Sequence, residues 1–149
     1  AAQLANEVLA YAADYGIDIT AKDAIGYVAK ELKNNQTDVK ATKAKLLAMS
    51  QGTYSNLAGS LTDQVSLRDL SMNYISEMAR TLEINGSDIT PNDATIQTAL
   101  RNNGQNGTMS LTDFNKMLRN DPRWAKTKNA REEAAGYANK ILTSFGLSA

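Results

Sequence analysis

The sequence predicts an all-α fold, a compact bundle of about six or seven short to medium helices in a single domain over residues 1–149. Apolar residues recur at helical spacing in most segments, and helix-capping pairs precede several of them. No window sustains the two-residue alternation that indicates a β-strand. The chain begins with alanine instead of methionine. We therefore expect either a processed product or the C-terminal segment of a longer chain.

Two helices are predicted at the start of the chain. The first spans roughly residues 2–15 and ends at Gly16, where a left-handed cap is expected. Thr20 and Asp23 form a capping pair that opens the second helix, which ends at residues 34–35. The residues expected to face inward are Leu4, Val8, Tyr11, Ala12 and Tyr15 in the first helix, and Ile25, Val28, Ala29 and Leu32 in the second.

A third helix is predicted to begin after Thr37 or Asp38, either of which supplies a cap, and to carry Gly52 near its end. Its apolar members are Val39, Leu46, Leu47 and Met49. The segment 54–61 keeps helical spacing for its apolar residues, but the glycine and serine at 59–60 interrupt it. This segment therefore predicts a short helix or a turn.

Two further helices are predicted in the middle of the chain. Ser66 and Asp69 open the first of them, and an Asn-Gly pair at residues 85–86 ends it. Its apolar side consists of Leu67, Leu70, Tyr74, Ile75, Met78 and Leu82. The sequence TPND at residues 90–93 supplies an N-cap, a proline at the first helical position and a carboxylate at the third, so we expect the second helix to start there.

The C-terminal part predicts two more helices. Ser110 and Asp113 read as a capping pair for the first, and Asp121-Pro122 stops it and starts another. The last helix, from Thr127 to Phe145, has one apolar stripe whose alanines would let a neighbouring helix approach closely. The stripe consists of Ala130, Ala134, Tyr137, Ala138, Ile141, Leu142 and Phe145.

The composition excludes several classes of function. The chain has neither cysteine nor histidine, which removes disulfides, thiol nucleophiles, histidine-based triads and zinc sites with these ligands. Sixteen basic residues balance sixteen acidic ones, and no basic stripe suggests nucleic acid. No apolar run approaches the roughly 20 residues of a membrane span, so none is expected. We also expect no cofactor.

The loop at residues 102–113 has the spacing of an EF-hand calcium loop, but its residues at the ligand positions match that loop less well. Such a loop carries carboxylates at its first, third and fifth positions and a glutamate at its twelfth. The candidate ligands here are Asn102, Asn106, Thr108 and Asp113, with a single carboxylate among them. A glycine-rich connection between helices is the favoured interpretation, and a weak or vestigial calcium site is the alternative.

Four glutamates, at positions 77, 83, 132 and 133, are the acids to consider for sugar hydrolysis, which needs two carboxylates held across the ring. Nothing in the sequence pairs them, and basic residues lie near them at helical spacing. We interpret them as solvated helix charges and expect no enzymatic activity. Trp124, after Arg123, is either an exposed anchor for a partner or a plug between the last two helices.

The C-terminal part resembles a C-terminal helical module of tailed-bacteriophage virion proteins, both tape-measure-like and internal virion proteins. The resemblance is carried by MSLTDFNKMLRNDPRW at residues 109–124, by Thr127, Asn129 and Ala130, and by Phe145-Gly146 at the end of the last helix. Its most specific element is Leu-Arg followed by Asp-Pro-Arg-Trp.

The likeness extends upstream through ISEMARTLEI at 75–84 and ITPNDATIQTAL at 89–100, so it covers about residues 65–146. It departs at 54–55, where the relatives are expected to have tyrosine followed by proline.

This resemblance implies a structural protein of the virion that acts in assembly or genome delivery. Its expected partners are other phage virion proteins, or further copies of this chain within the tail. The residues expected to make partner contacts are Arg123, Trp124, Tyr137 and Phe145. Some relatives carry a lytic transglycosylase domain on the same chain, but no glutamate here sits in its signature. The alternative function is an EF-hand-like helical calcium-binding module.

Overall fold

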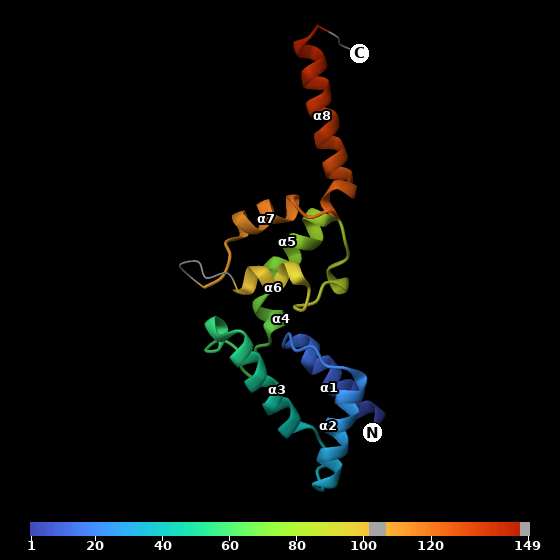
Figure 1. The fold of residues 1–149 in the computed structure, drawn as a ribbon, viewed down its shortest axis with the longest axis vertical. Coiled ribbons are helices and arrows are strands. Elements are labelled where there is room, and N and C mark those ends of the chain that lie inside the picture. The colour runs from blue at the N-terminus through green and yellow to red at the C-terminus, as the bar shows by residue number, and fades with distance from the viewer. Residues whose placement is uncertain (102–106, 147–149) are drawn as a thin grey trace.

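The computed structural model describes residues 1–101 and 107–146 of the chain. Within these residues it contains eight α-helices, three short 3₁₀-helices and no β-strand, so the all-α prediction is confirmed. Helices α1 to α7 form the bundle, and α8 continues from one end of it (Figure 1). None of the described helices is long and apolar enough to cross a membrane.

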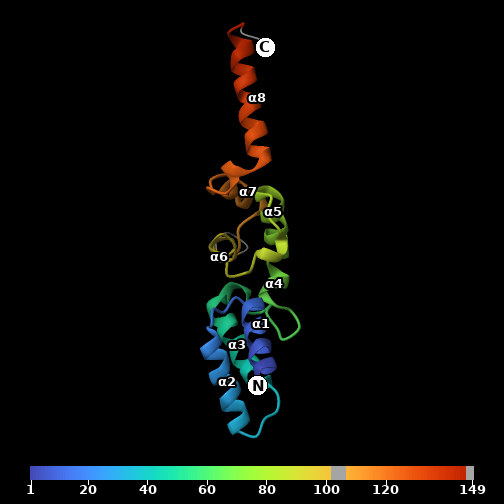
Figure 2. The same cartoon turned by 90° about the vertical axis from the view of Figure 1, so that its right-hand side faces the viewer.

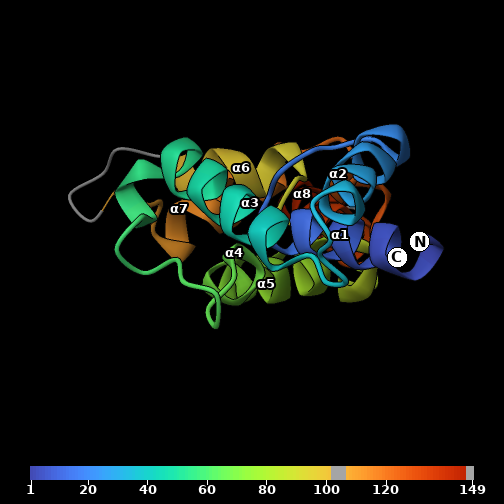
Figure 3. The ribbon, with the colours of Figure 1, turned by 90° about the horizontal axis from the view of Figure 1, so that it is seen from below.

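Helices α1 (Ala2–Asp14), α2 (Ala21–Lys33) and α3 (Lys40–Thr53) pack together at the N-terminal end. Figure 3 views this end, with the three helices in front of the rest. The predicted Thr20–Asp23 capping box opens α2. The buried residues of this first cluster are Ala5, Val8, Ala12, Ile17, Ala24, Val28, Val39 and Leu46.

The inward face of α2 differs from the predicted one. Val28 is buried as expected, but Ile25 and Leu32 are 60% and 47% exposed, and Ala29 is exposed as well. The helix instead buries Ala24, Val28 and Glu31, a row displaced by about one residue around the helix. Glu31 is tolerated inside because its carboxylate accepts a hydrogen bond of 2.8 Å from the buried Thr42 hydroxyl.

The second part of the bundle contains α4 (Leu67–Leu70), α5 (Met72–Leu82), α6 (Ala94–Arg101) and α7 (Leu111–Arg119). The 3₁₀-helices η1 (Ser55–Leu57), η2 (Gly86–Asp88) and η3 (Trp124–Lys126) lie in their connections. The buried residues of this second cluster are Tyr15, Tyr54, Leu61, Leu67, Tyr74, Ile75, Met78, Leu82, Ile89, Ile96, Ala99, Leu100, Phe114 and Leu118.

Three predicted helix boundaries need correction. The third helix begins at Lys40 with Val39 as its N-cap, and neither Thr37 nor Asp38 occupies the capping position, although the Asp38 carboxylate accepts from the Lys40 amide. The helix expected to begin after Ser66 is divided at Ser71, whose hydroxyl donates to the Arg68 carbonyl and competes with the helical pattern. The helix expected from Thr90 begins only at Ala94. Residues 90–93 form a turn, and the Asp93 carboxylate accepts from a backbone amide in the first turn of α6.

The two clusters meet at Gly16, which has the predicted left-handed backbone, with φ 68°. A Cβ atom at this position would lie 2.4 Å from a Leu67 methyl carbon and 2.7 Å from the Tyr54 hydroxyl. That hydroxyl donates to the Gly16 carbonyl over 3.2 Å. Tyr11 packs against both clusters and stacks on Tyr15. The bundle therefore closes around a residue that has no room for a side chain.

Helix α8 (Lys128–Ser144) extends away from the bundle and lengthens the molecule (Figures 1 and 2). The described chain has α1–α3 at one end, α4–α7 in the middle and α8 at the other end. After its first turn, α8 is exposed along nearly its whole length. The predicted helix is present, but no described residue covers the outer part of its apolar stripe.

We predict that Gly16→Ala lowers the free energy of unfolding by about 2–4 kcal/mol, because it adds left-handed strain and overpacks the contact with Leu67 and Tyr54. Gly26→Ala is the control. Gly26 lies within α2 with nothing near its Cβ position, so this change should stabilise the chain by up to about 1 kcal/mol. Denaturant unfolding of both variants measures the difference. Equal effects would contradict the role assigned to Gly16.

Candidate protein-interaction helix

The start of α8 is held by two capping groups from different parts of the chain. Thr127 is the N-cap, and its buried hydroxyl oxygen accepts from the Ala130 amide over 3.0 Å. The Glu83 carboxylate accepts from the two amides between Thr127 and Ala130, those of Lys128 and Asn129, at 3.1 and 3.0 Å. Together they satisfy three of the amides that a helix leaves unpaired at its N-terminus.

Glu83 therefore has a more specific role than the solvated charge that the sequence predicts. It ends α5 with a left-handed backbone, φ 55°, which is uncommon for a residue other than glycine. This conformation places its carboxylate at the positive end of the α8 dipole. The hydrogen bond from the Asn129 amide, with that from Lys128, holds the pKa of Glu83 below its ordinary value.

Further contacts brace α8 against α7. The Arg119 guanidinium pairs with Glu133 at 2.9 Å and lies 5.2 Å from the centre of the Trp124 ring. Trp124 is half-buried and packs against the second cluster. Arg123 pairs with Asp121 at 2.7 Å, and this pair lowers the pKa of the Asp121 carboxyl. This placement matches the interpretation of Trp124 as a plug, and partner contacts by Trp124 and Arg123 stay a prediction.

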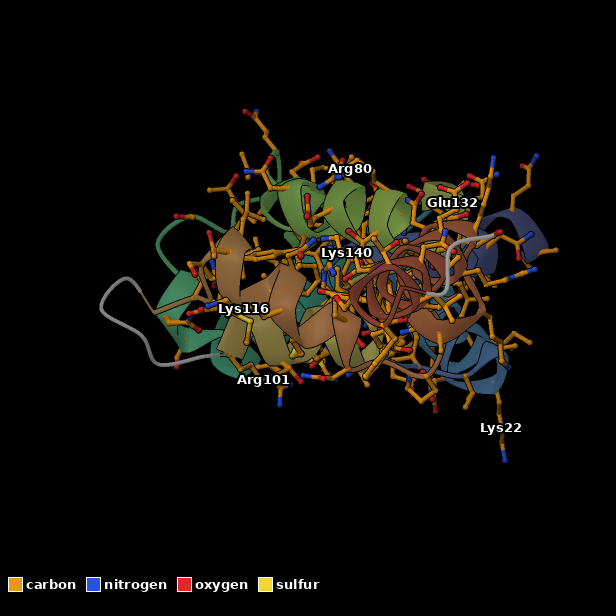
Figure 4. The ribbon with its side chains drawn as sticks, turned by 90° about the horizontal axis from the view of Figure 1, so that it is seen from above. Lys22, Arg80, Arg101, Lys116, Glu132 and Lys140 are labelled. Atoms are coloured by element: carbon orange, nitrogen blue, oxygen red, sulfur yellow. The ribbon has the colours of Figure 1, made fainter. Side chains whose placement is uncertain are left out.

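The other two predicted contact residues lie elsewhere, out along α8. Tyr137 is 60% exposed and Phe145 is 76% exposed. Ile141 and Leu142, between them, are 57% and 40% exposed. The four side chains lie on one side of the helix at three- and four-residue spacing. Figure 4 looks along α8 from its outer end.

An uncovered stripe of this kind is a feature of binding surfaces. Single exposed apolar residues are normal, but contiguous apolar patches on a rigid element mark interaction sites. Sequence reasoning found the stripe and expected a neighbouring helix against it. It did not predict that the neighbour is absent from the described chain, because helical periodicity reports which residues share a face and not what covers them.

A second apolar surface lies between α1 and α2, at the opposite end of the molecule (Figure 1). It is a groove of about 420 Å³. Its lining is almost wholly apolar and includes Ala5, Leu9, Ile25, Ala29 and Leu32. The sequence prediction had assigned the α2 members to the core, so it missed this groove.

The remaining candidate acids are engaged by basic or amide groups. Glu77 accepts from Arg80 and from Asn115, both at 2.7 Å, and the bond from Arg80 lowers its pKa. Glu132 lies 3.7 Å from Lys128, one turn earlier on the helix. These contacts fit the interpretation of Glu77 and Glu132 as helix charges.

Half of the candidate calcium ligands, Asn102 and Asn106, lie outside the described residues. Of the other two, Thr108 precedes α7, and Asp113 is exposed in its first turn, where its amide donates to the Ser110 hydroxyl. The described ranges contain no group of three or more acidic residues placed to hold a metal ion. The calcium site stays a prediction.

Comparison of the chain with models of known protein families, with curated proteins and with solved structures finds no match in any of the three. The resemblance to phage virion proteins therefore stays an expectation, and the arguments about function below start from the geometry of α8.

The capping role of Glu83 predicts a pH dependence. Because its pKa is lower in the folded state, the carboxylate stabilises the fold above its unfolded pKa, and this contribution is lost as the pH falls through the folded pKa. We expect the amides of Lys128 and Asn129 to lose hydrogen-exchange protection relative to the rest of α8 as the pH falls below about 4.5. Glu83→Gln should weaken this protection already at neutral pH and remove the pH dependence. Unchanged protection in that variant would contradict the capping role.

For the loop at 102–113, we predict that millimolar calcium leaves the melting temperature unchanged, because the loop supplies too few carboxylates to replace the water around the ion. Calorimetric titration and thermal unfolding with and without calcium measure this. A rise in melting temperature that Asp113→Asn abolishes would establish the calcium alternative instead.

Proposed function

We propose that this chain is a structural module of a bacteriophage virion, part of or associated with the tail tape measure, which acts in assembly or genome delivery by docking α8 against other proteins. The observation that carries the proposal is the exposed apolar stripe of α8, which no described residue covers beyond the base of the helix. The function requires helical contacts and no catalytic residue.

The way in which α8 is mounted supports docking. Its first turn is tied to α5 by Glu83, and its second turn is tied to α7 by the Arg119–Glu133 pair. A helix held in this way presents its stripe in one direction before any partner binds. Less conformational freedom is then lost on binding, which favours affinity. The same stripe on a loosely tethered peptide would bind more weakly.

The choice of a virion context rests on the resemblance over residues 65–146. Its most specific part, the Asp-Pro-Arg-Trp passage at 121–124, leads into η3 and the N-cap of α8. In the structure these residues belong to the junction that carries α8. The residues that carry the resemblance therefore lie next to the helix that carries the exposed stripe, which supports a link between the virion context and docking by α8.

The test is to purify virions of a phage that encodes this sequence and to identify its peptides, and the length of the chain that carries them, by mass spectrometry. We expect the peptides in the tail fraction. A much longer chain would support a tape-measure segment, and a free chain of this size a small dedicated tail protein. Absence from virions would overturn the proposal.

The contribution of α8 is tested with a matched pair of variants in the same phage. Ile141→Asp places a charge within the stripe, and we expect it to lower incorporation into virions about tenfold or more, as for a central interface residue. Asn139→Asp adds the same charge to the other side of α8, where we expect little effect. Equal incorporation of the two variants would show that the stripe is not the docking surface.

A further inference from the structure

The groove between α1 and α2 is a long apolar recess at the end of the molecule opposite α8 (Figure 1). Its lining residues on α2 run from Ala21 to Leu32, which is a length of about 16 Å. Five of the ten lining residues are alanines, and Asn6 is the single polar one. The volume of about 420 Å³ lies within the range of roughly 300–1,000 Å³ that small-molecule sites have.

The larger side chains of the groove are left in contact with water. Ile25 and Leu32 are exposed, and Leu9, on the α1 side, is partly buried. Single exposed apolar residues are normal on a protein surface, but here they border one common recess together with the alanines. An apolar occupant would remove all of them from water at once, which favours binding.

The charge at the edge of the groove is positive. Lys22 precedes Ile25 by three residues and Lys33 follows Ala29 by four, so both lie beside the groove on α2, near its two ends. Neither lysine forms an ion pair with a described residue.

The acids of α1 and α2 do not offset this charge, because each is engaged by another group. The four are Glu7, which pairs with Lys43, Asp14, which pairs with Arg68, Asp23, which caps α2, and Glu31, which binds Thr42. Asp18, in the connection between the helices, borders a different hollow. The groove therefore combines an uncharged lining with two lysines at its edge.

We propose that this groove binds a single-chain anionic amphiphile of the class of medium-chain fatty acid carboxylates. The hydrocarbon chain lies along the alanines between α1 and α2, and the carboxylate lies at Lys22 or Lys33. Because a lysine is present near each end, the chain binds in either direction. The site is separate from α8 and does not depend on its docking role.

Two other occupants fit the groove less well. Attraction to an anionic bilayer takes clusters of about four to eight basic residues, and this edge has two. A stable protein interface takes about 20–30 residues on each side, and the groove has ten. A single chain needs neither a wide charged surface nor a large contact area.

The length of the groove predicts which chain binds best. With C–C bonds of about 1.5 Å and angles near 111°, an extended chain advances about 1.25 Å per carbon, so the groove holds about 12 carbons. The groove is open to solvent along one side, so each methylene group is only partly buried. We therefore expect affinity to rise about two- to fourfold per added methylene group and to level off beyond about 12 carbons.

The test begins with calorimetric titration of the purified chain with octanoate, decanoate, dodecanoate and tetradecanoate below their micelle concentrations. We expect one site, with a dissociation constant for dodecanoate on the order of 100 μM. Dodecyltrimethylammonium has the same chain with a positive head group, and we expect it to bind about fivefold more weakly or less. Absence of dodecanoate binding at millimolar concentration, or equal binding of the two head groups, would overturn the proposal.

A matched pair of variants locates the site. Ala29→Phe fills the middle of the groove from an exposed position, and we expect it to lower the affinity for dodecanoate about tenfold or more. Ala48→Phe adds the same side chain to an exposed position on α3, where we expect no effect. Circular dichroism confirms that both variants keep their helices. Equal affinities of the two variants would place the fatty acid elsewhere and overturn the proposal.

Reversal of the edge charge tests the role of the lysines. Lys22→Glu combined with Lys33→Glu should lower the affinity for dodecanoate about fivefold and raise that for dodecyltrimethylammonium. The control combines Lys30→Glu with Lys116→Glu, which changes the net charge equally at exposed positions away from the groove. An equal loss in both double variants would contradict a carboxylate site at the groove edge.

The remaining outcomes identify a different occupant. Binding to phosphatidylglycerol vesicles without any binding of dodecanoate would assign the groove to a bilayer and overturn the proposal. Self-association that Ala29→Phe abolishes, again without dodecanoate binding, would assign it to a second copy of the chain. Neither result bears on the virion experiment, since Ile141→Asp in α8 should bind dodecanoate as the unchanged chain does.

Discussion

The described bundle depends on the close approach of its two hydrophobic clusters at Gly16. The left-handed backbone there turns the chain out of α1, and the missing side chain leaves room for Leu67 and the Tyr54 ring. The Tyr54 hydroxyl then bonds the carbonyl of the same residue, so one position sets both the turn and the contact. The two clusters are also connected by Tyr11, which is partly buried and packs against both. This junction makes the two groups of helices one body.

The second junction, between the bundle and α8, is built differently. It is mainly polar: the Glu83 carboxylate, the Thr127 hydroxyl and the Arg119–Glu133 pair replace the apolar packing found at Gly16. Polar contacts fix direction through their geometry without burying the face of the helix. This is the combination that a docking helix needs, since its apolar residues must stay available while its orientation is held. Trp124 adds a large apolar side chain next to this junction, since it packs against the second cluster.

Local signals predicted most of the fold, and tertiary geometry explains what they missed. Capping pairs located the starts of α2, α4 and α7, because a cap is determined by a few neighbouring residues. The predicted inward face of α2 was wrong because Ile25 is exposed and Glu31 is buried, and the Glu31 carboxylate finds its hydrogen-bond partner in Thr42, a residue of α3. The role of Glu83 was missed for the same reason, since the amides that it caps follow it by more than forty residues.

The apolar stripe of α8 differs from those of the bundle helices in what covers it. A stripe on any helix indicates that something covers it, and for α1 or α5 the cover is the rest of the bundle. For α8 the bundle covers only the base, at Ala130. The same pattern therefore changes meaning with the position of the helix: in the bundle it describes a core, and on a projecting helix it describes half of an interface.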